Sequence, residues 1–175
     1  DTIISRMSEA ARLEQALQES EPERFDLNAV VSASVESYHS VWPQQSFRYQ
    51  APGEPCRIDG MPDLVVQMLD KLAGNAVDFC TPGTSIDLSV ARRAGSVELE
   101  VRNLGPLLPG EMSDKLFESM VSIRNDKGSE DPHLGLGLYI VRLIAEVHGA
   151  RARASNLPGG EGVAVQIVFP EPGQR

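Results

Sequence analysis

Two glycines, Gly135 and Gly137, stand just before an apolar run whose spacing predicts a helix over residues 134–148. Glycine costs a helix about 1 kcal/mol relative to alanine, so a pair of glycines at a helix start needs an explanation. One explanation is a ligand whose phosphates bind the backbone N–H groups that the first helical turn leaves free. The other is a tight turn without a ligand, and these residues alone leave both open.

A second group of polar residues lies on the helix predicted over residues 61–79. Lys71, Asn75 and Asp78 follow one another at helical spacing and form a polar stripe beside an apolar one. Asparagine is a mediocre helix former, and its amide oxygen is a hard ligand suited to Mg²⁺. Asp78, one turn later, is placed to hold a water molecule, a ribose hydroxyl or a metal-bound water. The alternative is a solvated helix face that carries mixed charges.

The composition predicts an acidic chain with one hydrophobic core. The 175 residues are 41% hydrophobic, and the formal net charge is −9. This charge and the lack of a basic stripe argue against a nucleic-acid surface. They also mean that an anionic nucleotide would need a divalent cation and local positive groups. Cys56 and Cys80 are too few for a disulfide framework or a metal-ligand spacing, so we expect reduced thiols.

The sequence contains no apolar run of about 18–20 residues and no signal-peptide pattern. Because the chain begins at Asp1, we expect a fragment of a longer protein, in which upstream membrane segments are possible. Residues 3–18 form an amphipathic helix, and the charged segment 19–23 then breaks the pattern. This predicts a helix that leaves one module and enters another, although packing on its own domain is the alternative.

Helices and strands are predicted in an order that does not alternate strictly, which favours an α+β sheet-and-helix fold over a doubly wound sheet. Apart from residues 3–18, the predicted helices span 27–38, 61–79, 111–117 and 134–148. The predicted strands span 46–50, 55–58, 84–91, 96–102, 151–155 and 162–169, with a hairpin around 92–95. Residues 123–132 are polar and predict a loop.

Taken together, these segments resemble the ATP-binding catalytic domain of bacterial sensor histidine kinases. The wider group includes gyrase-type and chaperone-type ATPases and the anti-sigma-factor kinases. The resemblance covers residues 25–170 and rests on motifs in the family's order. They are Asn75-Ala76 (asparagine box), Val101–Leu107 (first glycine box), Leu116–Met120 (phenylalanine box) and Gly135–Leu138 (second glycine box). Residues 1–18 then resemble the end of the second helix of the preceding dimerisation module.

The resemblance implies a two-layer α/β sandwich, in which a mixed sheet of about five strands is backed by three helices. Mg-ATP would lie between helices 61–79 and 134–148, with Mg²⁺ on Asn75 and adenine framed by Asn103 and Gly105. Segment 122–132 corresponds to the family's ATP lid, where Arg124 and Lys127 would offset the triphosphate charge; a solvated loop is the alternative. The implied ATP-binding residues are Asn75, Asp78, Asn103, Gly105, Arg124, Lys127, Leu134, Gly135, Leu136, Gly137 and Leu138.

The first glycine box departs from the family pattern. Asn103 replaces the aspartate that reads adenine, and Leu107 replaces the second glycine. An amide oxygen still accepts a hydrogen bond from the adenine N6 amine, but it lacks the negative charge that strengthens the bond. The phosphate end of the implied site therefore matches the family more closely than the adenine end.

The position one turn before Asn75 separates branches of the family. The ATPases and anti-sigma kinases carry a glutamate there that acts as a general base, whereas this chain has Lys71. Asp70 is offset by about 100° round the helix and should point away. A domain without its own base fits a kinase whose nucleophile, a histidine imidazole, comes from another module and needs little deprotonation.

None of the three histidines lies in the sequence context of the family's phosphoacceptor. His148, on the apolar face of its helix beside Gly149, is expected to be buried or to cap the helix. His133 is expected to be a loop residue, with a contact to phosphate as the alternative. No catalytic residue is therefore expected within this fragment.

The resemblance implies a protein-histidine kinase that transfers the γ-phosphoryl group of ATP to an upstream histidine for relay to a response regulator. Residues 1–20 would be the end of the dimerisation helix and a linker, and residues 21–175 the catalytic domain. The expected partners are the protein's own dimerisation module, in a homodimer, and the response regulator, but no nucleic acid. The domain is expected to be cytoplasmic and to meet a membrane only through upstream segments. A degenerate interaction module of the same fold, with weak or no ATP binding, and a stand-alone ATPase are the alternatives.

Overall fold

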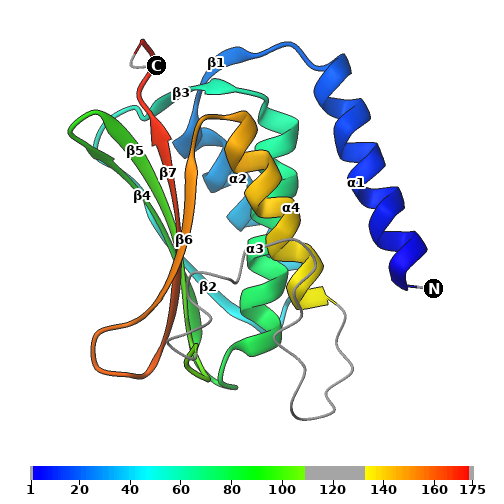
Figure 1. Cartoon of the computed structure of the whole chain (residues 1–175). Coiled ribbons are helices and arrows are strands. Elements are labelled where there is room, and N and C mark those ends of the chain that lie inside the picture. The colour runs from blue at the N-terminus through cyan, green and yellow to red at the C-terminus, as the bar shows by residue number, and fades with distance from the viewer. Residues whose placement is uncertain (1, 109–132, 174–175) are drawn as a thin grey trace.

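A mixed sheet forms one layer of the structure, a computed structural model that describes residues 2–108 and 133–173 (Figure 1). Its five strands run in the spatial order β2-β4-β5-β7-β6. β2 is parallel to β4, and every other neighbouring pair is antiparallel. The strands are β2 (Ser46–Gln50), β4 (Ser85–Arg93), β5 (Ser96–Leu104), β6 (Arg151–Asn156) and β7 (Gly162–Pro170). The predicted mixed sheet of about five strands is confirmed.

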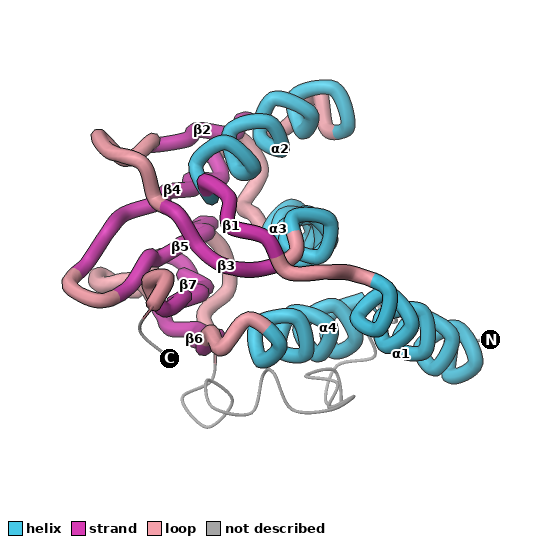
Figure 2. Tube along the Cα trace, turned by 90° about the horizontal axis from the view of Figure 1, so that it is seen from above, coloured by secondary structure: helices cyan, strands magenta, loops and turns pink. Residues whose placement is uncertain are grey.

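Helices cover one face of this sheet and form the second layer. α3 (Pro62–Phe79) lies between α2 (Leu27–Val41) and α4 (His133–Val147), as the view from above shows (Figure 2). The predicted α+β two-layer sandwich with three backing helices is confirmed, and each predicted boundary of these helices lies within about three residues of the observed one. The predicted helix 111–117 lies outside the described residues. Among the helices of the described ranges, none is long and apolar enough to cross a membrane.

Alternation along the strands produces the two faces of the sheet. On β4, the side chains of Ile86, Leu88 and Val90 are buried and face the helices. The intervening residues belong to the opposite, open face, which is rich in charged side chains. Burial of one face only explains why the period-two pattern of β4 and β5 was readable from the sequence.

α1 (Thr2–Glu19) lies alongside α4 in both views (Figures 1 and 2). Leu13 is only 1% exposed, and Ala16 and Leu17 pack against the main hydrophobic core. The C-terminal half of α1 therefore packs on its own domain, which was the alternative to a helix that only enters from another module. The division of the chain at residue 20 stays a prediction.

A two-stranded sheet beside the main one was not predicted from the sequence. β1 (Glu23–Asp26) pairs antiparallel with β3 (Arg57–Gly60), two residues later than the predicted strand 55–58. Arg24 holds Asp59 with two hydrogen bonds of 2.8 and 3.3 Å, and the Asp26 carboxylate accepts the N–H of Cys56 at 3.1 Å. Strands this short lack readable alternation, and contacts between residues distant in sequence stabilise them.

Candidate nucleotide-binding site

α3 and α4 are antiparallel, and one hydrogen bond fixes their register. His148, just past the end of α4, accepts the Met61 N–H at the start of α3 through Nε2 at 3.0 Å. Its Nδ1 donates to the carbonyl of Ile144 at 2.7 Å, so the ring is neutral in this arrangement. His148 is 2% exposed, which confirms the prediction of a buried histidine. Gly149, with φ of +67°, ends this segment in the left-handed conformation.

This register brings the two predicted phosphate-end motifs to the same level. Gly135 lies 13 residues before His148 on α4, which is about 20 Å along that helix. About 20 Å along α3 from Met61 lies Gly74, next to Asn75. Figure 1 shows the start of α4 beside the C-terminal half of α3. The helices therefore bring the asparagine box and the second glycine box to the same level, as the family resemblance implies.

Asn75 lies on the side of α3 that faces α4. It is about 140° round the helix from Asp70, whose carboxylate accepts the Tyr38 hydroxyl of α2 at 2.7 Å. Because α3 lies between α2 and α4, the Asn75 side chain is directed toward α4. It is half-buried, and none of the side-chain hydrogen bonds within the described ranges involves its amide. The amide oxygen is therefore available to a ligand.

The position of Asp70 supports the sequence argument about a general base. Its carboxylate bonds to α2, on the far side of α3 from the start of α4. Burial and the hydrogen bond to Asp70 raise the pKa of Tyr38 well above its ordinary value, so the hydroxyl stays protonated as the donor. Lys71 occupies the position one turn before Asn75, so no carboxylate stands there.

The end of β5 and the end of α3 meet in a close backbone contact. A Cβ atom on Gly105 would lie 2.2 Å from the Phe79 carbonyl oxygen, so only glycine fits there. The Thr81 N–H donates to the Leu104 carbonyl at 2.8 Å, which closes the same joint. This contact places Asn103 and Gly105 beside the last turn of α3, where Asp78 is exposed.

Asn103 is 9% exposed and belongs to the helix-facing row of β5. Its Nδ2 donates to the Leu104 carbonyl at 3.2 Å. Because a carbonyl only accepts, this bond fixes which end of the amide is the NH₂ group and leaves Oδ1 as the acceptor. The predicted difference at this position, an uncharged acceptor in place of a carboxylate, is thus compatible with the observed hydrogen bonding.

The β6–β7 hairpin holds the segment that follows Asn103. The Gly105 N–H donates to the Glu161 carbonyl at 3.0 Å. Asn156 accepts the Leu108 N–H through Oδ1 at 2.8 Å and donates to the Leu108 carbonyl through Nδ2 at 2.9 Å. The Asn156 side-chain amide thus bonds both the N–H and the C=O of Leu108, as the backbone of a neighbouring strand would. Asn156 was not among the residues predicted from the sequence, although an asparagine at a strand end before Leu157-Pro-Gly-Gly is a turn signal.

Some of the remaining predicted ATP-binding residues lie at the start of α4, and others lie outside the described residues. Leu138 is fully buried in α4, and Leu134, Gly135, Leu136 and Gly137 lie in its first turns. Arg124, Lys127 and the predicted phenylalanine box lie outside the described residues.

Across residues 2–108 and 133–173, no three His, Cys, Asp or Glu side chains gather to hold a metal ion. Mg²⁺ commonly binds through one or two protein groups together with substrate phosphates, so a single half-buried amide fits such a site.

Comparisons with known proteins agree with this geometry. Residues 60–173 match the family described as histidine kinase-, DNA gyrase B- and HSP90-like ATPases. The chain is 27% identical over 171 residues to the sensor protein CutS of Streptomyces coelicolor, covering 97% of this chain and 41% of CutS. It is 27% identical over 139 residues to the adaptive-response sensory kinase SasA of Crocosphaera subtropica, covering 78% of this chain and 36% of SasA.

Solved structures share the fold. The catalytic domain of the histidine kinase ThkA superposes with a TM-score of 0.74 at 23% identity, covering 89% of this chain and all of that one. The mycobacterial sensor histidine kinase MprB gives 0.72 at 23% identity, covering 86% and 98%. The chain spans 41% of the length of CutS, so it matches one part of that longer protein. The family match covers more than half of the chain, and with the antiparallel α3–α4 pair it shows that this chain belongs to the histidine kinase-, DNA gyrase B- and HSP90-like ATPases.

Proposed function

We propose that this chain is the ATP-binding catalytic domain of a sensor histidine kinase. The observation that carries this proposal is the α3–α4 register, because it brings the amide of Asn75 to the level of the helix start at Gly135. Relatives named as an adaptive-response sensory kinase and as a sensor-like histidine kinase support the histidine-kinase branch. The presence of Lys71 in place of an acidic residue supports a kinase over a stand-alone ATPase, which needs a base to activate water.

Each part of the site would contribute to positioning the nucleotide. Asn75 would hold Mg²⁺, which neutralises phosphate charge when bound. Backbone N–H groups of the first turn of α4, at Leu134 and Gly135, would bind phosphate because the helix leaves them free, and Gly135 and Gly137 would allow close approach. Asn103 and Gly105 would frame the base, Asp78 would bind a water molecule or a ribose hydroxyl, and Arg124 and Lys127 would offset charge from the lid. Leu136 and the fully buried Leu138 would contribute by anchoring the start of α4.

The reaction would then be a direct phosphoryl transfer. An imidazole nitrogen from an upstream dimerisation module attacks the γ-phosphorus, a P–N bond forms, and the P–O bond to ADP breaks with its electron pair leaving on ADP. Positioning and charge neutralisation account for catalysis of this kind. No general base from this domain is required, because the attacking nitrogen of a neutral imidazole carries no proton.

The wider assignment follows from the same proposal. Residues 1–20 would be the end of the dimerisation helix and a linker, and residues 21–175 the catalytic domain on the cytoplasmic side of an inner membrane. The partners would be the dimerisation module of a homodimer and a response regulator. ThkA, which shares the fold, has been solved in complex with the response regulator protein TrrA. The net charge of −9 supports the expectation that nucleic acid is not a partner.

Calorimetric titration with ATP in the presence of Mg²⁺ tests the binding step. We expect saturable heat that is lost in Asn75→Ala and unchanged in Gln67→Ala, a matched polar residue two turns earlier on α3. Absence of heat at millimolar ATP, or an unchanged signal in Asn75→Ala, would contradict the proposal and favour the degenerate interaction module. In the full-length protein, γ-labelled ATP should give an acid-labile phosphohistidine. Steady release of phosphate by the domain alone would instead support an ATPase.

A further inference from the structure

β6 forms one edge of the main sheet. In the described part of the chain it pairs with β7 on one side and has no strand on the other. Figure 1 shows this strand at the margin of the sheet nearest α4. An edge strand presents a row of backbone N–H and C=O groups, and an extended segment of another chain can pair with them. The side chains beside this edge therefore decide which segment would fit.

Two arginines lie on the open face of β6, the face turned away from the helices. Arg151 is opposite Val168 on β7, and Arg153 is opposite Gln166. Gln166 bonds Glu100 on the open side of β5 at 2.6 Å, which identifies the face. Both arginines are exposed, and within the described ranges neither forms an ion pair. No carboxylate of the described residues therefore neutralises their positive charges.

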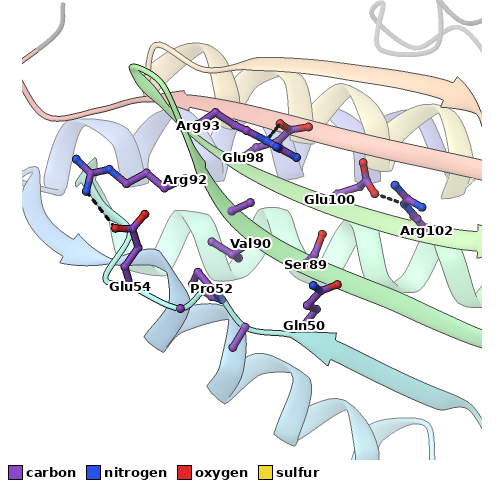
Figure 3. Close-up of a pocket in the computed structure, with 13 residues that line it drawn as sticks. Gln50, Pro52, Glu54, Ser89, Val90, Arg92, Arg93, Glu98, Glu100 and Arg102 are labelled. Carbon is purple, nitrogen blue, oxygen red and sulfur yellow. Dashed lines mark hydrogen bonds and ion pairs between the residues drawn. The ribbon is translucent and has the colours of Figure 1, made fainter.

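The other arginines on this side of the sheet have carboxylate partners. Figure 3 shows Arg93 directed toward Glu98, at 3.6 Å, and Arg102 directed toward Glu100. Farther along, Arg48 bonds Asp87 through two N–H groups at 2.8 and 2.9 Å. The groove of about 440 Å³ that Arg93, Glu98, Glu100 and Arg102 help to line is charge-compensated. Among the described residues of this open face, the arginines without a carboxylate partner are those of β6.

The charges of Arg151 and Arg153 distinguish between two possible added strands, a second copy of β6 and an acidic segment of another protein. A second copy of β6 paired antiparallel about Ala152 would place Arg151 opposite Arg153, and like charges directly opposite are destabilising. An acidic strand would place carboxylates opposite both guanidinium groups, which bind carboxylates through two parallel hydrogen bonds. Side chains two residues apart on a strand are about 6.7 Å apart, so the carboxylates must alternate with other residues. The chain's overall charge of −9 disfavours binding of an acidic segment to other parts of the surface.

We propose that β6 binds an extended acidic segment of a partner protein, which adds to the sheet as an additional strand with its carboxylates on Arg151 and Arg153. This proposal is independent of nucleotide binding. The open edge gives affinity through the backbone, and the two arginines give selectivity for carboxylates at alternate positions.

Fluorescence anisotropy with synthetic peptides tests this proposal on the whole chain. The probe is a peptide in which threonine and glutamate alternate. The controls are a block peptide of the same composition, in which all threonines precede all glutamates, and a peptide in which lysine replaces glutamate. We expect the alternating peptide to bind at least fivefold more tightly than the block peptide, and the lysine peptide not to bind. Hydrogen exchange of the outward-facing β6 amides should slow when the alternating peptide is added.

Paired variants assign the binding to β6. Arg151→Glu with Arg153→Glu should weaken the alternating peptide at least tenfold, whereas Arg12→Glu with Arg57→Glu, two exposed arginines elsewhere, should change it less than twofold. If the glutamate variant does not fold, Arg151→Gln with Arg153→Gln replaces it, with a loss of at least fivefold expected. Equal binding of alternating and block peptides, unchanged β6 exchange, or no effect of the β6 variants would overturn the proposal. So would tighter, arginine-dependent binding to anionic phospholipid vesicles or duplex DNA.

Discussion

Replacement of Gly105 by alanine should disrupt the joint between β5 and α3. Gly105 has φ of +156°, and a Cβ atom there would lie 2.2 Å from the backbone carbonyl oxygen of Phe79. Contacts of this kind below 3.0 Å essentially never occur, so the two backbones must separate by at least about 0.8 Å. The obstacle is backbone, and therefore no side-chain rotation can relieve it. Separation would strain the Thr81–Leu104 hydrogen bond of 2.8 Å.

The expected loss of stability has two parts. An alanine at a positive φ costs about 1–3 kcal/mol, and forcing one extra carbon into a packed position costs about 1–3 kcal/mol more. Gly159 provides a matched control, because its φ is +98° but a Cβ atom would meet nothing within 4 Å. Gly159→Ala should therefore show the conformational cost without the clash. For a domain of this size, the clash lowers the melting temperature of Gly105→Ala by a further 2–12 °C or so.

Two measurements test this reasoning. Thermal unfolding followed by circular dichroism compares the melting temperatures of the Gly105→Ala and Gly159→Ala variants. In the full-length protein, Gly105→Ala should reduce catalytic efficiency for ATP about ten- to a hundredfold, since a displacement approaching 1 Å at a binding site has effects of that order. If both alanine variants melt together and use ATP equally well, the loop absorbs the Cβ atom and the joint does not position the site.

Other predictions concern individual hydrogen bonds and one titration. Asn156→Ala should destabilise the chain by about 1–2 kcal/mol in urea unfolding and weaken ATP binding, because both bonds to Leu108 are lost; Asn156→Asp, which keeps only the acceptor, should lie between. Burial raises the pKa of Tyr49 to about 12 from an ordinary value of 10.0. Between those pH values the folded state keeps a proton that the unfolded state releases, so stability falls as pH rises, by less than about 1.4 kcal/mol per pH unit since the ring is only half-buried. Tyr49→Phe should flatten that slope, and an unchanged slope would contradict the assignment. Tyr38→Phe should cost about 1–2 kcal/mol, and a double-mutant cycle with Asp70→Asn should show that most of this cost is their shared bond.

Amphipathic periodicity accounts for the elements that were predicted correctly. Val65, Leu69, Leu72 and Ala76 on α3 are all buried, and Phe79 at the end of that stripe is half-buried. A helix or strand with one buried face repeats its apolar residues at a fixed period, and a single sequence displays that period directly. The same argument predicted β4 and β5 and the hairpin between them, where Arg93 is opposite Ser96.

Elements stabilised by contacts between distant residues were not predictable in this way. β1 has four residues, and its pairing depends on Asp59 and Cys56, which lie thirty or more positions from the β1 residues that they bond. The Asn156–Leu108 bond, which spans 48 positions, is of the same kind. In both cases the residue type indicates a turn or a cap, but the partner is set by the fold, so local patterns carry no information about it.

The relation between α3 and α4 combines both kinds of information. The sequence identified Asn75 and Gly135 separately and, by resemblance, expected them to face one ligand, but periodicity within a helix does not determine its register against another helix. The register follows from His148 and from Gly60, where a Cβ atom would lie 2.1 Å from the His148 ring. Because a helix pair packs as a rigid unit, a contact at one end sets the level of residues about 20 Å away at the other. Gly60 and His148 are not among the predicted ATP-binding residues. They are nevertheless necessary for binding, because their contact aligns Asn75 with Gly135.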